Sequence, residues 1–155
     1  MNGSRPNVGG HIEGNAYDPD LIDGLQSDHR ELLVMFSQIS RAAEQGPYDG
    51  IPDQLTNFKT RLEAHLLAEN YRFYGYLEEK LSRDSENATL IRDFRKEMNT
   101  IARQVVNFIK TWRQQGVTAE TAPKFREELG QIGTILKHRI GREEQSLYPL
   151  YSPMD

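Results

Sequence analysis

The chain has 155 residues, a length that suits one domain with a sizeable core. Its formal net charge is −4 and its basic residues are scattered, so we expect no nucleic-acid binding. The absence of cysteine excludes disulfides, thiolate metal sites and cysteine nucleophiles. No apolar run approaches the roughly 18 residues of a membrane span, and the start of the chain lacks the pattern of a signal peptide. We therefore expect a cytoplasmic protein without a membrane partner.

The first residues differ in composition from the rest of the chain. Residues 1–17 are rich in glycine, asparagine, serine and proline and have no hydrophobic periodicity, which predicts a flexible tail. Beyond them, apolar residues recur at three- and four-residue steps, the pattern of amphipathic helices. We therefore expect a single helical domain over residues 18–155.

Four helices are predicted, separated by segments rich in glycine, proline and polar residues. We expect the first over residues 18–45, with Pro19 in its first turn. The others are expected over residues 53–81, 88–115 and 123–147. Four helices of about 25 residues joined by short loops, with no strand candidate, indicate an all-α fold. The predicted architecture is an antiparallel up-down-up-down four-helix bundle.

Three of the four predicted apolar stripes contain polar residues, whereas the stripe of the third helix is wholly apolar. A buried carboxylate costs several kcal/mol unless it is paired, ligated or neutralised. Counting outward from the predicted loops at about 1.5 Å per residue brings the polar members of the stripes to one level. We therefore expect one polar layer at mid-bundle, formed by His29, His65, Glu69, Arg139 and Glu143.

Two segments resemble one family signature. The sequence HLLAE at residues 65–69, followed by Phe73 and Tyr74, resembles the His-x-x-x-Glu and Leu-Phe-Pro signature of hemerythrin-like HHE cation-binding domains. Residues 139–149 resemble a second copy, and residues 28–32 resemble the family's first-helix histidine. The resemblance covers about residues 18–151 and implies a non-haem iron bundle that binds oxygen, senses oxygen or nitric oxide, or handles iron. It also implies four metal ligands: His29, His65, Glu69 and Glu143.

Two departures from that family indicate a reduced site. Arg139 stands where the family has a fourth-helix histidine, and the third helix has no histidine. A full five-histidine di-iron site therefore cannot be built. Two imidazoles and one carboxylate remain as the set used by mononuclear non-haem iron. Glu143 could bridge to a second ion, and Glu97 or His138 would complete the coordination of that ion after a local rearrangement.

Arg139 also supports a second hypothesis. Residues 129–143 resemble the last helix of the regulator-of-sigma-D anti-sigma family, whose members are helical bundles that bind a sigma factor. In a metal-free core, Arg139 would pair with Glu143, and Glu69 would take either the other edge of the guanidinium or a protonated His65. The charge of Arg139 would also repel a divalent ion. Two functions thus remain open: an iron protein that senses or carries oxygen, nitric oxide or iron, and a metal-free regulatory bundle that binds a protein partner. We expect neither to be an enzyme.

Overall fold

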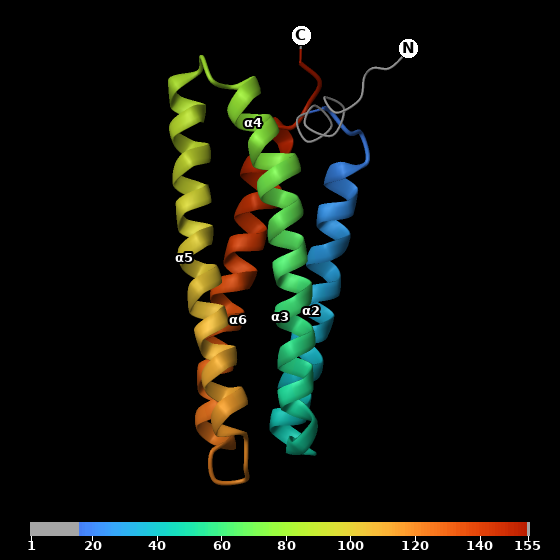
Figure 1. The fold of residues 1–155 in the computed structure, drawn as a ribbon, viewed down its shortest axis with the longest axis vertical. Coiled ribbons are helices and arrows are strands. Elements are labelled where there is room, and N and C mark those ends of the chain that lie inside the picture. The colour runs from blue at the N-terminus through green and yellow to red at the C-terminus, as the bar shows by residue number, and fades with distance from the viewer. Residues whose placement is uncertain (1–15, 155) are drawn as a thin grey trace, which may run out of the picture.

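The computed structural model describes residues 16–154 (Figure 1). Residues 1–15, which form most of the predicted flexible tail, lie outside this range, so the tail remains a prediction. Within the described residues the chain forms four long helical rods and no strand. The bounds of the elements are α2 (Leu21–Gln45), η1 (Tyr48–Gly50), α3 (Ile51–Ala68), η2 (Glu69–Tyr74), α4 (Gly75–Lys80), α5 (Ser85–Gln115), α6 (Ala122–Arg142), η3 (Glu143–Leu147) and η4 (Tyr148–Leu150).

The rods follow one another in antiparallel order. The second rod runs without a break through α3, η2 and α4, and the fourth runs from α6 into η3. Figure 1 shows α2 and α3 joined at the same end of the bundle as α5 and α6. The predicted all-α, up-down-up-down four-helix bundle is therefore confirmed. Within residues 16–154, no helix has both the length and the apolar character that crossing a membrane would require.

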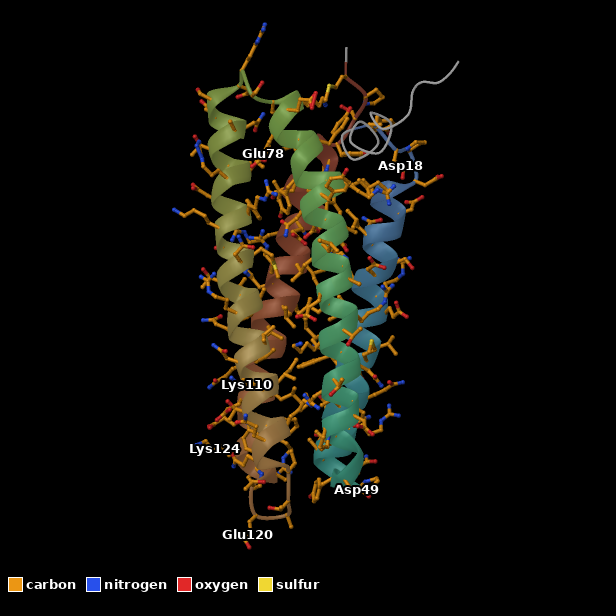
Figure 2. The ribbon with its side chains drawn as sticks, in the orientation of Figure 1. Asp18, Asp49, Glu78, Lys110, Glu120 and Lys124 are labelled. Atoms are coloured by element: carbon orange, nitrogen blue, oxygen red, sulfur yellow. The ribbon has the colours of Figure 1, made fainter. Side chains whose placement is uncertain are left out.

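Local sequence explains where the rods end. Gly46 and Gly116 follow α2 and α5 with φ of 75°, a conformation that glycine adopts without strain. The side chain of Asp84 caps α5 by accepting a hydrogen bond from the Asn87 backbone nitrogen at 3.1 Å. The helix therefore begins at Ser85, three residues before the predicted start at residue 88. The charged side chains labelled in Figure 2, among them Lys110 and Glu120, lie on the outside or at the ends of the rods.

The core consists of two apolar clusters separated by polar residues. One cluster includes Leu32, Leu62 and Leu136, and the other includes Leu25 and Leu147. Between these levels lie the buried charged and polar side chains of the described chain: His29, His65, Glu69, Arg139 and Glu143. The predicted polar layer is thus present, with apolar residues on both sides that exclude water from it.

Two π-helical segments were not predicted. The segment η2 begins at Glu69 and the segment η3 begins at Glu143. A π turn holds an extra residue, so the residues after each glutamate are rotated relative to a regular α-helix. Both members of the pairs 73–74 and 147–148 are buried. Both segments therefore bring an additional side chain toward the polar layer.

Candidate metal centre

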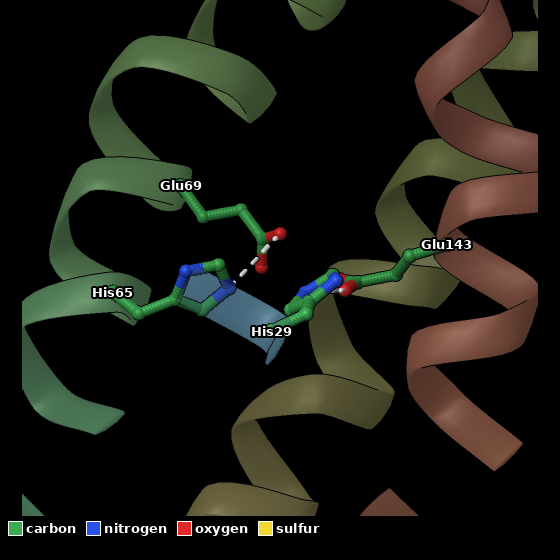
Figure 3. A group of neighbouring side chains, drawn as sticks. All are labelled: His29, His65, Glu69 and Glu143. Carbon is green, nitrogen blue, oxygen red and sulfur yellow. Dashed lines mark ion pairs between the residues drawn. The ribbon is translucent and has the colours of Figure 1, made fainter. Parts of the chain in front are cut away.

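Four buried side chains from three rods point toward one another (Figure 3). They are His29 from α2, His65 from α3, Glu69 at the start of η2 and Glu143 at the start of η3. Each is at most 3% exposed. One nitrogen or oxygen atom from each residue lies within 4.8 Å of the corresponding atoms of the other three. The four residues proposed from the sequence therefore form one group that could hold a metal ion.

The spacing inside the group suits a single ion. The His65 Nε2 and Glu69 Oε2 atoms are 3.5 Å apart, and the His29 Nε2 and Glu143 Oε1 atoms are 3.3 Å apart. An octahedral ion with bonds of about 2.1 Å places adjacent ligand atoms about 3 Å apart and opposite ones about 4 Å apart. Small movements of these side chains would bring all four atoms to ligand distance.

A carboxylate orients each imidazole from behind. The His29 Nδ1 atom lies 2.7 Å from Glu144 Oε2, and the His65 Nδ1 atom lies 2.9 Å from Asp28 Oδ2. Because an ionised carboxylate only accepts hydrogen bonds, both Nδ1 atoms act as donors, and each Nε2 faces the group. Ligand histidines in metal sites almost always have such a partner. The donor set and its supporting carboxylates therefore fit a cation.

Protons compensate the buried charges of the group. Burial lowers the pKa of His65, but the hydrogen bond and charge of Glu69, together with Asp28 and Glu143, outweigh burial and raise this pKa to about 9. Burial raises the pKa of Glu69, yet its hydrogen bond with His65 and the charge of that histidine bring the pKa below its ordinary value. Burial and the neighbouring charge of Glu69 raise the pKa of Glu143. A bound cation would replace the protons as the compensating charge.

Arg139 lies in the polar layer but turns away from this group. Its Nη1 donates to Glu97 Oε1 at 2.7 Å and its Nη2 donates to the Phe94 carbonyl at 2.6 Å. Its Nε is 3.7 Å from Glu143 Oε2, so the predicted proximity to Glu143 is present at a longer distance. The guanidinium is directed to α5 and not to Glu69, which instead pairs with His65 at 3.5 Å, the other partner considered for it.

Glu97 and His138, which were considered as ligands for a second ion, lie outside the group. Glu97 is exposed and pairs with Arg139 and Arg142. His138 is exposed on α6, one residue from the buried face. Within the described residues, the structure therefore brings together the four predicted ligands and neither of these two.

Two tyrosines contact the carboxylates, and the sequence analysis assigned them no role. The Tyr148 hydroxyl donates to Glu69 Oε2 at 2.8 Å, and the Tyr74 hydroxyl donates to Glu143 Oε2 at 3.0 Å. Burial and the nearby carboxylate charges raise the pKa of both phenols above its ordinary value, so both are neutral donors in the metal-free protein. In the sequence, the signal that could have indicated these tyrosines is that each directly follows a buried apolar residue, at position 73 or 147.

An apolar cavity of about 30 Å³ lies against the four candidate ligands. Its other walls come largely from leucine side chains, together with Phe36, Met98, Gly133 and Arg139. A cavity of roughly 10–15 Å³ already holds a water molecule, so this one has room for a diatomic molecule. Gly133 supports one wall, because a Cβ atom at this position would lie 2.7 Å from the Phe36 ring.

In a comparison with protein-family models, residues 20–151 match the hemerythrin HHE cation binding domain. The matched range includes the four rods and the four candidate ligands. No match is found among curated proteins or among solved structures.

Proposed function

The chain belongs to the hemerythrin HHE cation-binding family, and from this membership we propose that it binds non-haem iron. The ligands are His29, His65, Glu69 and Glu143. The observation that carries the proposal is their convergence, with each imidazole oriented by its own carboxylate. Mixed imidazole and carboxylate ligands without thiolate suit iron, which when bound would supply a Lewis-acidic, redox-active centre.

The surroundings of the site support a sensor or carrier rather than an enzyme. The ligands are almost wholly buried, and the adjoining cavity has a volume of about 30 Å³. Such a volume admits a diatomic gas and excludes an organic substrate. We therefore propose that oxygen or nitric oxide reaches the site through this cavity, or that the bound iron itself is the signal.

The metal-free alternative, a regulatory bundle that binds a protein partner, was motivated by Arg139 at a ligand position and by the wholly apolar third helix. That arginine is engaged by Glu97 and by the Phe94 carbonyl. Its charge is therefore partly compensated on the side of α5, and the charge of the two glutamates is compensated by protons in the ligand group, which a cation can replace. The contacts of Arg139 thus favour the metal-binding proposal.

The proposal predicts stoichiometric iron. The protein is reconstituted anaerobically with ferrous iron, desalted and measured by elemental analysis, and parallel samples receive zinc or manganese. We expect about one iron per chain, because the four ligand atoms surround a single position. Less than about a tenth of an equivalent of every metal would contradict the proposal, since a closed site with this donor set retains its ion.

The cavity gives a second prediction. Gly133→Ala places a methyl group against Phe36, and this ring lines the cavity beside the four ligands. We expect the displaced ring to reduce the space in that cavity. To bind there, nitric oxide must push the ring back against the added methyl group, and such overpacking costs about 1–3 kcal/mol. We therefore expect the affinity of the ferrous protein for nitric oxide to fall at least about fivefold. The measurement is a visible-absorbance titration with nitric oxide.

Gly130→Ala is the matched control. Gly130 lies on the same helix, and a Cβ atom there meets nothing within 4 Å. Both variants gain the same helix propensity, so a general stiffening of α6 would affect them equally. Equal nitric oxide affinities in both variants, at equal iron content, would show that the cavity does not admit the gas.

A further inference from the structure

The two buried tyrosines bond to different ligand carboxylates, and only one of them bonds to the oxygen that faces a histidine ligand. The Tyr148 hydroxyl bonds to Glu69 Oε2, the oxygen that faces His65 Nε2. The Tyr74 hydroxyl bonds to Glu143 Oε2, whereas the other oxygen of Glu143 faces His29. Tyr148 therefore contacts the inner side of the ligand group and Tyr74 contacts its outer side.

The Tyr148 oxygen also lies near a second ligand atom. It is 3.2 Å from His29 Nε2 in addition to being 2.8 Å from Glu69 Oε2. Adjacent ligands of an octahedral ion with bonds of about 2.1 Å are about 3 Å apart, so both distances equal the spacing between neighbouring ligands. The phenol oxygen thus lies within reach of an ion that the group would hold.

The Tyr74 oxygen, in contrast, is already engaged. It accepts a hydrogen bond from Arg139 Nη2 at 3.1 Å while it donates to Glu143. This pair of contacts fixes the outer oxygen of Glu143. Tyr74 is therefore a positioning residue, and the chain contains a matched pair of buried tyrosines with distinct roles.

The ring of Tyr148 is held in place by its neighbours. It stacks on the His29 ring with centroids 5.7 Å apart and an interplanar angle of 9°. The Phe73 ring packs edge-on against it at 5.0 Å. The π-helical segment η3 ends directly before Tyr148 and turns it into the core. Its hydroxyl therefore points into the site without any rearrangement of the backbone.

We propose that Tyr148 is a metal ligand and supplies a phenolate oxygen to an iron(III) ion held by His29, His65, Glu69 and Glu143. The O–H bond of the phenol breaks, an oxygen–iron bond forms, and the proton passes to solvent. Three anionic oxygens then balance the charge of iron(III), and hard oxygen ligands favour this ion. The inference rests on the proposed function, because it requires the iron site.

The test uses the visible spectrum of the intact protein loaded with ferric iron. A phenolate bound to iron(III) produces a visible charge-transfer band and enhances tyrosine ring vibrations in resonance Raman spectra. We expect both in the wild-type protein and in Tyr74→Phe. Tyr148→Phe should lose both, and its iron content, measured in parallel, should show iron held by the four remaining ligands.

The outcomes separate this inference from the proposed function. A wild-type protein with a full equivalent of iron but no phenolate vibrations would overturn the ligand role of Tyr148 and leave the iron site intact. A band that persists in Tyr148→Phe would overturn it as well. If Tyr148→Phe holds no iron, the vibrations of the wild type decide whether a phenolate is bound, and their retention in Tyr74→Phe assigns them to Tyr148. A wild-type protein that binds no iron would contradict the proposed function itself.

Discussion

His65→Ala is expected to lower the affinity for iron by more than about 100-fold. Loss of a residue that only hydrogen-bonds to a ligand already costs about 10–100-fold in metal affinity, and loss of the ligand itself should cost more. The His65 ring supplies one of the two imidazoles, and its Nε2 atom lies 3.5 Å from Glu69 Oε2 inside the ligand group. No third imidazole lies in the group to replace it, because the only further histidine of the described residues, His138, is exposed on α6. Competition with a chelator of known affinity measures the change.

Two further variants are expected to have smaller effects on iron affinity. Asp28→Asn removes the carboxylate behind His65 and should weaken iron binding by about 10–100-fold, since the imidazole loses the partner that orients it. His138→Ala removes an exposed histidine outside the group and should leave the affinity unchanged. If all three variants bind iron as the wild type does, the metal lies elsewhere in the chain.

Arg139→Leu is expected to reduce the free energy of unfolding by about 3 kcal/mol, at the low end of the range for breaking a buried ion pair. The side chain is 2% exposed and contacts Glu97, the Phe94 carbonyl and Tyr74. The cost is at the low end because Glu97 is exposed and regains water when the arginine is removed. For a chain of this size the melting temperature should fall by roughly 6–12 °C.

Arg142→Leu is the control for this prediction. Arg142 is on the same helix, pairs with the same Glu97 oxygen at 3.1 Å and lies over the same Phe94 ring, but it is 42% exposed. Exposed ion pairs contribute only about 0–1 kcal/mol, so its melting temperature should change little. Thermal melts of both variants, each with and without iron, provide the measurement. Equal shifts for the two variants would mean that burial of Arg139 is not what stabilises the layer.

The sequence alone determined the bundle and the level of its polar layer. Apolar residues at three- and four-residue steps define one buried face per helix, and short loops require neighbouring helices to be antiparallel. The rise per residue then places His29, His65, Glu69 and Glu143 at one height, because the counts from each loop are similar. Helix boundaries were less exact: α5 begins at Ser85 because Asp84 supplies the cap.

The tertiary structure decided which atoms meet within that layer. The partner of Arg139 could not be predicted, because its long side chain reaches several carboxylates and the packing of α5 against α6 selects Glu97. The π turns after Glu69 and Glu143 follow no local propensity, since neighbouring rods determine which hydrogen-bonding pattern buries the aromatic side chains. These turns bring the Tyr148 hydroxyl to Glu69 and His29, a contact between residues far apart in the sequence that helical periodicity does not encode.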